Sequence, residues 1–134
     1  MRCFRPLTGP RAVNWVGDSS IFGQNSHVAL TSFANGSLFG ARFGDDPPRV
    51  IALHGWGRNH RDFDRCLDGL NAVSIDLPGF GASPVPSQAG GAAMYADLIS
   101  PILDTCKTPV VVVGHSFGGR VAVHLTARRP AAIG

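Results

Sequence analysis

The sequence predicts an α/β fold in which helices cover a mostly parallel sheet that begins with an antiparallel hairpin. Two strand-like runs within residues 27–43 flank Asn35-Gly36, a dipeptide typical of tight hairpin turns. Short apolar runs at residues 49–53, 71–77 and 109–113 then alternate with segments that have helical spacing. A β-α-β-α-β-α order of this kind calls for parallel strands joined by helices.

The last of these runs contains four consecutive valines. A strand of this composition is typical of a parallel strand that is buried on both faces, because neither face can then carry polar side chains. We therefore expect both faces of residues 109–113 to be covered.

Three helices are expected between and after these strands. The first is capped by Asn59, the second spans residues 92–106 with a kink at Pro101, and the third follows Gly119. Residues 79–91 form a loop rich in Gly, Pro and Ser. The apolar residues expected to face the core are Phe63, Leu67 and Leu70 in the first helix, Leu98, Ile102 and Leu103 in the second, and Val121, Ala122 and Leu125 in the third.

Composition favours a single globular domain and gives no support for nucleic-acid binding. The 134 residues are 44% hydrophobic and 16% charged. The net charge of +3 comes from arginines spread along the chain, with no basic run interleaved with aromatic residues. All nine acidic residues are Asp.

The cysteines and the first residues predict a cytoplasmic protein without metal or cofactor. Cys3, Cys66 and Cys106 are odd in number and follow neither a disulfide pattern nor a zinc-binding spacing. Residues 1–26 show no sustained period and lack the apolar region of a secretory signal, so we expect a poorly defined leader before a core domain at 27–134. No segment is apolar for long enough to span a membrane.

The segment Gly114-His115-Ser116-Phe117-Gly118 fits the G-x-S-x-G pattern of a nucleophile elbow. In that turn a strained serine stands between a strand and a helix, and its hydroxyl points out over the end of the sheet. The flanking glycines let the strand and the helix approach each other closely. The pattern starts at the end of the valine strand and opens a helix, which is the context that a nucleophile elbow requires. The alternative interpretation is that Ser116 falls in a turn by chance.

Two further motifs accompany the elbow in the order found in the α/β-hydrolase family, which the chain resembles from about His27 to its end. His54-Gly55-Trp56-Gly57 resembles the oxyanion loop of that family, and residues 76–83 resemble its D-x-P-G-x-G-x-S turn. The resemblance is to the serine hydrolase branch and to its amino-terminal portion only. It implies an incomplete fold with the first five of roughly eight strands.

The resemblance implies the roles of individual residues. Ser116 would be the nucleophile, and the backbone N–H groups of Trp56 and Phe117 would stabilise the oxyanion. Substrate contacts are expected from His54, Gly55, Trp56, His115 and Phe117. His54 is expected to order the loop rather than to transfer protons, and His115 to be an elbow or pocket residue.

The triad acid and histidine that such a serine needs are not found after Ser116. In this family they follow the serine in the order acid, then histidine, but no Asp or Glu follows Ser116 and the only later histidine is His124, on the same expected helix. We therefore expect a truncated chain that is inactive alone. Its valine strand would have a bare outer edge at Pro109–Val113, through which copies could associate.

The leading hypothesis is a serine hydrolase that cleaves an ester, thioester or related acyl bond of a small molecule through a Ser116 acyl-enzyme. A serine at the elbow argues against the dehalogenase and epoxide-hydrolase branches, which use Asp. The alternatives are a non-catalytic, hydrolase-like protein that binds a ligand, and a fragment without function. Hydrolysis and acyl transfer are not distinguished, because either can follow from one acyl-enzyme.

Overall fold

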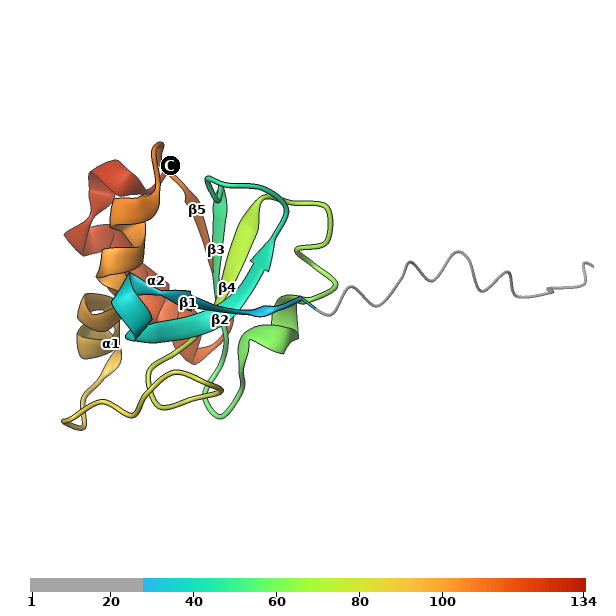
Figure 1. Ribbon diagram of the computed structural model, residues 1–134. Helices are drawn as coiled ribbons and strands as arrows, with labels where there is room; N and C mark the ends of the chain where they lie inside the picture. The colour runs from blue at the N-terminus through green and yellow to red at the C-terminus, as the bar shows by residue number, and fades with distance from the viewer. Residues whose placement is uncertain (1–27) are drawn as a thin grey trace, which may run out of the picture.

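A five-stranded mixed sheet forms the centre of the computed structural model, which describes residues 28–134 (Figure 1). Its strand order is β1-β2-β4-β3-β5. Pairs β1–β2 and β2–β4 are antiparallel, whereas β3–β4 and β3–β5 are parallel. The strands are β1 (Leu30–Phe33), β2 (Leu38–Phe43), β3 (Val50–Leu53), β4 (Ala72–Asp76) and β5 (Val111–Gly114). The predicted fold class is confirmed; the expected leader, residues 1–26, and His27 lie outside the described residues.

The predicted hairpin forms with Phe33 opposite Leu38. Its turn is the 3-10 segment η1 (Ala34–Gly36), in which Asn35 and Gly36 have φ values of 57° and 85°. Such left-handed conformations are those that Asn and Gly adopt most readily, which explains why this dipeptide marks the turn.

Helices α1 (Ala92–Ile99) and α2 (Phe117–Arg128) pack together against one face of the sheet (Figure 1). The main core lies between them and the strands, and fifteen buried residues form it. Val121 and Leu125 face this core as predicted and are fully buried, and Ala122 packs at its margin. Arg128 and Pro130 end the helix, and the short segment η4 (Pro130–Ala132) follows.

The prediction of a helix after Asn59 is wrong. Asn59 does cap a turn, because its side chain accepts a hydrogen bond from Arg61 N at 3.0 Å, but only the 3-10 segment η2 (His60–Phe63) forms. The residues that follow include Asp64, Asp68 and Gly69, which are poor helix formers, and Gly69 has a φ of 75°.

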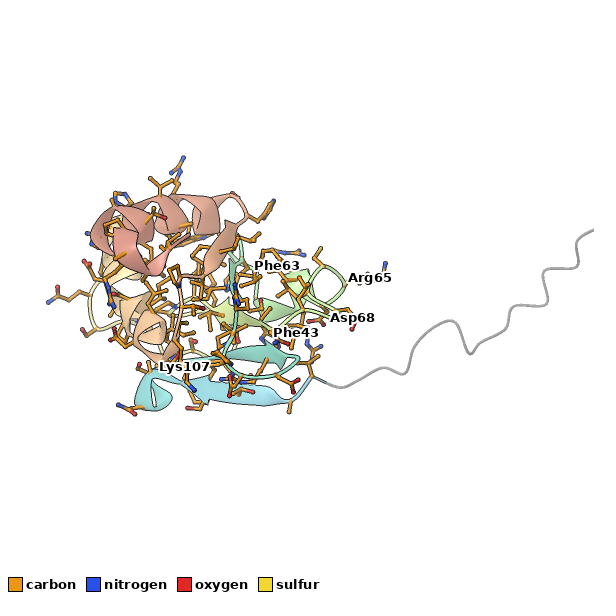
Figure 2. All side chains as sticks on the ribbon, turned by 90° about the horizontal axis from the view of Figure 1, so that it is seen from above. Phe43, Phe63, Arg65, Asp68 and Lys107 are labelled. Atoms are coloured by element: carbon orange, nitrogen blue, oxygen red, sulfur yellow. The ribbon has the colours of Figure 1, made fainter. Side chains whose placement is uncertain are left out.

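A second, smaller core nevertheless forms under this segment, on the other face of the sheet. Phe63 and Leu67 pack there with Phe43, while Arg65 and Asp68 of the same segment point outward (Figure 2). Leu70, which was expected to be buried beside Phe63 and Leu67, is 44% exposed.

The second helix is divided at Pro101, as expected. Helix α1 ends at Ile99 and the chain continues as the 3-10 segment η3 (Ser100–Thr105). Ile102 and Leu103 are buried as predicted, but Leu98 is 40% exposed, which corrects that prediction. Tyr95, Ala96 and Ile99 are buried instead, so the buried face of α1 is turned toward Ala96 and leaves Leu98 at its margin.

Strand β5 lies at the edge of the described sheet next to β3, as expected, but two other expectations about it are corrected. Val110 is buried, but Val111 and Val113 are 51% and 40% exposed, so the strand is covered on one face only. Its outer edge is not bare throughout, because Ile133 forms a parallel bridge with Val110. No helix within residues 28–134 has the length and apolar character needed to span a membrane.

Candidate active site

The carboxyl ends of β3, β4 and β5 carry the three motifs that the sequence analysis singled out. Because these strands are parallel, residues 54–57, 77–83 and 114–118 all leave the sheet at the same end. In open α/β sheets, ligands bind at this end of the strands. Ser116 lies there, at the junction of β5 and α2, and its side chain is exposed.

Ser116 adopts a strained backbone conformation, with φ of 53° and ψ of −113°. It is one of three non-glycine residues with positive φ among residues 28–134, and the other two lie in the hairpin turn. Strain at a single serine between a strand and a helix is the geometry expected of a nucleophile elbow.

The glycines on both sides of Ser116 allow this geometry. A Cβ on Gly118 would lie 2.5 Å from the carbonyl oxygen of His54 and closer still to that of Leu53. A Cβ on Gly114 would lie 2.5 Å from the carbonyl oxygen of Gly118. Helix α2 can therefore start close to β5 and β3 only because Gly114 and Gly118, respectively, lack a side chain.

The backbone of Gly55 passes directly beside the elbow. A Cβ on Gly55 would lie 3.0 Å from Nδ1 of His115 and 3.5 Å from Cβ of Ser116. Among residues 28–134, no acceptor is found for the N–H groups of Trp56 and Phe117, which follow Gly55 and Ser116 in the chain. The expected pair of oxyanion donors is thus unengaged and near the serine.

His54 is fully buried, and both of its ring nitrogens have backbone partners. Nδ1 donates to the carbonyl oxygen of Gly55 at 2.7 Å, and Nε2 accepts from the N–H of Leu77 at 2.9 Å. These partners assign a neutral ring protonated at Nδ1. The His54 side chain therefore joins the loop of residues 54–57, the expected oxyanion loop, to the end of β4. Contact with a substrate would fall to the loop that His54 holds.

Burial lowers the pKa of His54 from its ordinary value. This effect outweighs the hydrogen bond to Gly55 and the charges of Asp76 and Asp62, which raise the pKa. The ring is thus held in the neutral form that its two hydrogen bonds require.

The carboxylate of Asp76 is also fully buried and forms a second link between loops. It accepts hydrogen bonds from the backbone N–H of His60 at 2.7 Å, from Nδ1 of His60 at 2.9 Å and from the N–H of Ala82 at 2.9 Å. Gly81, with φ of 53°, lies against this carboxylate, where a Cβ would collide with it. With all these bonds made, Asp76 holds the turn.

Ser83 completes this turn. Its hydroxyl donates to the carbonyl oxygen of Asp76 at 2.6 Å and accepts from the N–H of Phe39 at 2.9 Å. The D-x-P-G-x-G-x-S segment is thereby fixed to both β4 and β2.

A chain of contacting aromatic rings lies beside the serine, and two of them, Trp56 and Phe117, line the hollow that contains it. The ring of Trp56 makes edge contacts with Phe80 at 5.0 Å and with Phe117 at 5.1 Å between centroids, and Tyr95 contacts Phe117 at 5.1 Å. Trp56 is 63% exposed. An open hollow of about 430 Å³ is lined by Trp56, Ser116, Phe117 and Arg120.

The histidines near the elbow do not supply a base in this structure. His115 and His124 are exposed, and no histidine within residues 28–134 is hydrogen-bonded to the Ser116 hydroxyl. Within the same residues, no group of three or more His, Cys, Asp or Glu is arranged to hold a metal ion.

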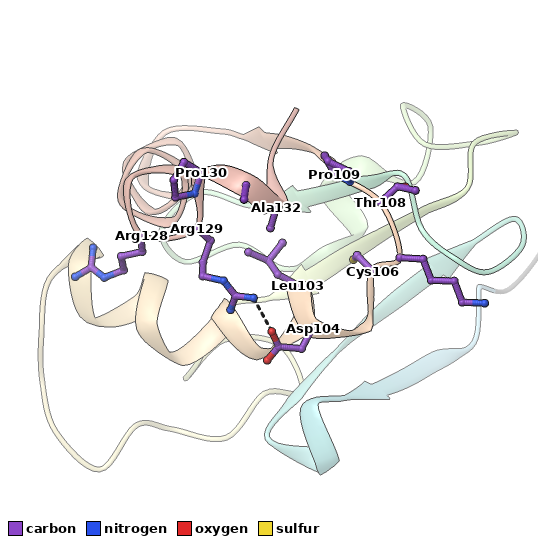
Figure 3. A pocket seen from close by; sticks show the side chains of 11 residues that line it. Leu103, Asp104, Cys106, Thr108, Pro109, Arg128, Arg129, Pro130 and Ala132 are labelled. Carbon is purple, nitrogen blue, oxygen red and sulfur yellow. Dashed lines mark hydrogen bonds and ion pairs between the residues drawn. The ribbon is translucent and has the colours of Figure 1, made fainter.

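A second hollow, of about 490 Å³, lies at the opposite end of β5, between the segment leading into that strand and the end of α2 (Figure 3). Arg129 forms an ion pair with Asp104 across it at 2.6 Å. Burial raises the pKa of the Cys106 thiol, so this cysteine is held as a weakly nucleophilic thiol.

Sequence reasoning missed two residues of the site. Nothing in the pattern links His60 to Asp76, since their contact depends on how two loops pack. Arg120 could have been found, because a residue four positions after Ser116 lies on the same helical face.

The chain matches the family model described as "Alpha/beta hydrolase family" over residues 50–133, which is more than half of its length. It belongs to the alpha/beta hydrolase family. This alpha/beta hydrolase is 34% identical over 103 residues to Esterase Rv0045c of Mycobacterium tuberculosis, covering 74% of this chain and 35% of the relative. It is 37% identical over 90 residues to a pimeloyl-[acyl-carrier protein] methyl ester esterase of Neisseria meningitidis, covering 64% of this chain and 34% of the relative.

Solved structures show the same similarity. The crystal structure of the M. tuberculosis esterase Rv0045c superimposes with a TM-score of 0.72 at 29% identity, covering 96% of this chain and 48% of that one. A thermophilic esterase superimposes with a TM-score of 0.62 at 28% identity, covering 78% of this chain and 40% of that one. The chain spans about a third of the length of the two relatives named above, Esterase Rv0045c and the methyl ester esterase of Neisseria meningitidis.

Replacement of Gly118 by alanine is expected to destabilise the protein by about 3 kcal/mol or more, because the added Cβ meets two backbone oxygens that cannot move aside. Gly119→Ala is the matched control. Its Cβ would meet its nearest neighbour at an ordinary 3.4 Å, so a change within about 1 kcal/mol is expected. Urea unfolding measures both, and equal stabilities would refute the close approach.

The lowered pKa of His54 predicts a pH-dependent stability. The folded state resists protonation of His54, whereas the unfolded chain takes up the proton near pH ~6.5. Stability should therefore be fully present above this pH and decline as the pH falls toward the lowered folded pKa. Urea unfolding between about pH 7.5 and 5 measures it.

His54→Gln should lose this part of the pH dependence, because glutamine does not titrate. His124→Gln, at an exposed position of α2, is the control and should retain it. An unchanged pH dependence in His54→Gln would contradict the assignment.

Proposed function

We propose that this protein cleaves an ester, thioester or related acyl bond of a small molecule through an acyl-enzyme formed on Ser116. The observation that carries the proposal is the strained conformation of Ser116 beside two unengaged N–H groups, those of Trp56 and Phe117. Strain at one exposed serine is maintained only where the surrounding structure enforces it, and such strain clusters at active sites.

In the proposed reaction the hydroxyl oxygen of Ser116 attacks the carbonyl carbon while a histidine accepts its proton. The carbonyl oxygen becomes an oxyanion, which the N–H groups of Trp56 and Phe117 stabilise; loss of one such donor typically costs about 10²–10³ in rate. The tetrahedral intermediate then expels the alcohol or thiol, which takes the proton from the histidine. Water attacks the acyl-enzyme in the same way and releases the acid.

The residues expected to contact substrate would have different roles, according to where each one lies in the site. The rings of Trp56 and Phe117 would form an apolar wall for the acyl group. Gly55 would let the substrate approach the loop backbone, and His115 would lie at the rim. His54 would act through the loop that it orders.

We further propose that the acid and the histidine of the triad come from residues outside these 134. No Asp or Glu follows Ser116, and His124 is exposed on α2, the helix that Ser116 precedes. The curated relatives, of which this chain covers about a third, have room for both residues.

The names of the relatives favour an ester as substrate, since they include esterases that act on methyl esters of an acyl-carrier-protein conjugate. A cytoplasmic location is part of the proposal. Cys66 and Cys106 are free thiols in the structure, which agrees with a reducing compartment.

Ser116→Ala should abolish hydrolysis of para-nitrophenyl esters and labelling by a serine-directed phosphonate, because both reactions need the hydroxyl. The measurement uses the longest protein that the coding DNA supports when it is read past the codon for Gly134. Ser37→Ala, at the distant hairpin turn, is the control and should leave both reactions intact. Ligand binding without turnover or labelling in the parent protein would instead favour a non-catalytic, hydrolase-like binding protein.

We also propose that the 134-residue chain associates with itself through the open part of the β5 edge. Val111 and His115 direct their N–H groups toward β3, so the intervening Val112 and Gly114 direct theirs outward. Within residues 28–134, the outward N–H groups of Val112 and Gly114 have no hydrogen-bond partner, because the bridge to Ile133 covers only Val110. Exposed strand edges of apolar composition tend to pair with other strands.

Val113→Lys should reduce this association, because a lysine at a strand edge opposes pairing with a second copy. Sedimentation velocity over a range of concentrations measures it, with Val123→Lys as the control. Val123 is 69% exposed on α2, away from the edge, so its replacement should change nothing. A chain that stays monomeric throughout would contradict the proposal.

A further inference from the structure

Arg120 is the one residue lining the hollow at Ser116 that the proposed reaction does not use. The other three lining residues supply the nucleophile, the oxyanion donors and the apolar walls. Arg120 is the only charged residue among the four. An exposed arginine on a helix is ordinarily a solvated surface residue, so its position and its surroundings must distinguish it from that.

Its position is fixed by the turn that carries the nucleophile. The backbone N–H of Arg120 donates to the carbonyl oxygen of Ser116 at 3.3 Å, which places it one helical turn after the serine. Side chains on a helix lean toward its amino terminus, so the Arg120 side chain is directed back over this first turn. The guanidinium can therefore reach a group bound next to Ser116.

Its charge has no partner among the described residues. Arg42, Arg58, Arg128 and Arg129 each form an ion pair with an aspartate within residues 28–134, whereas Arg120 forms none, like Arg49, Arg61 and Arg65. Of the arginines without an ion pair, Arg120 is the one that lines the hollow at Ser116. Asp104 is the last acidic residue of the 134, so neither α2 nor η4 carries a carboxylate side chain that could pair with Arg120. The hollow therefore offers an anion a planar donor group that no carboxylate within residues 28–134 occupies.

We infer that Arg120 gives the site a preference for acyl substrates that carry a carboxylate at the end of the acyl chain remote from the scissile bond. A guanidinium binds a carboxylate through two parallel hydrogen bonds, a geometry that fixes the position of the chain between them. The apolar rings of Trp56 and Phe117 would cover the methylene groups of that chain. This inference rests on the proposed function, since it names the substrate class of the same site.

The experiment compares two para-nitrophenyl esters in the longest natural form of the protein. One is the mono-ester of succinate, glutarate or adipate, and the other has a carboxamide in place of the free carboxylate. The ratio of kcat/KM for the anionic ester to that for the neutral ester should exceed one at the best chain length. In Arg120→Gln this ratio should fall by about ten- to a hundredfold, as expected for the loss of a charge-assisted hydrogen-bond pair.

Two further variants separate this role from a general effect of charge. Arg120→Lys should retain part of the ratio, because it keeps the charge and loses the paired donors. Arg65→Gln removes the same charge from an exposed position under the other face of the sheet and should leave the ratio unchanged (Figure 2). Added salt should lower the ratio in the parent protein but not in Arg120→Gln.

The outcomes distinguish the inference from the proposed function. If Ser116 is labelled by a phosphonate and the neutral ester is cleaved, but Arg120→Gln keeps the parent ratio, the inference alone is overturned. If neither ester is cleaved and Ser116 is not labelled, the proposed function fails and the inference fails with it.

Discussion

The site depends on two buried polar side chains at the carboxyl ends of β3 and β4. His54 and Asp76 are both fully buried, and every hydrogen-bonding atom of their side chains has a partner. A buried polar group that lacks a partner is costly, so each of these side chains requires its loops to stay in place. Together they connect the oxyanion loop, the η2 segment and the turn after β4.

The close packing of α2 against β3 adds a second constraint. Gly118 allows the helix to start on the carbonyl groups of Leu53 and His54, so the elbow and the oxyanion loop are held by the same contact. The strain at Ser116 is thereby maintained by elements on both sides of it. In the proposed reaction, His54 would order the loop that carries one donor and α2 would carry the other, so that the N–H groups of Trp56 and Phe117 would be positioned before any substrate arrives.

Local sequence patterns predicted the strands, the hairpin and the break at Pro101, because turn residues and apolar runs act over a few neighbours. They failed where two signals competed. The apolar spacing of Phe63, Leu67 and Leu70 suggested a helix, but Asp64, Asp68 and Gly69 disfavoured it and only the buried contacts of Phe63 and Leu67 remained. The valine run indicated burial on both faces, although β5 lies at the edge of the described sheet.

By itself, the sequence determined the fold class, the order of the strands along the chain and the three motifs. Each of these depends on patterns among residues that are close together in the chain. The tertiary structure alone decided which atoms meet: that His54 bonds Gly55 and Leu77, that Asp76 bonds His60 and Ala82, and that Arg120 shares a hollow with Trp56. These contacts join loops that are distant in sequence. Their partners are set by the packing of strands and helices, which no local pattern encodes.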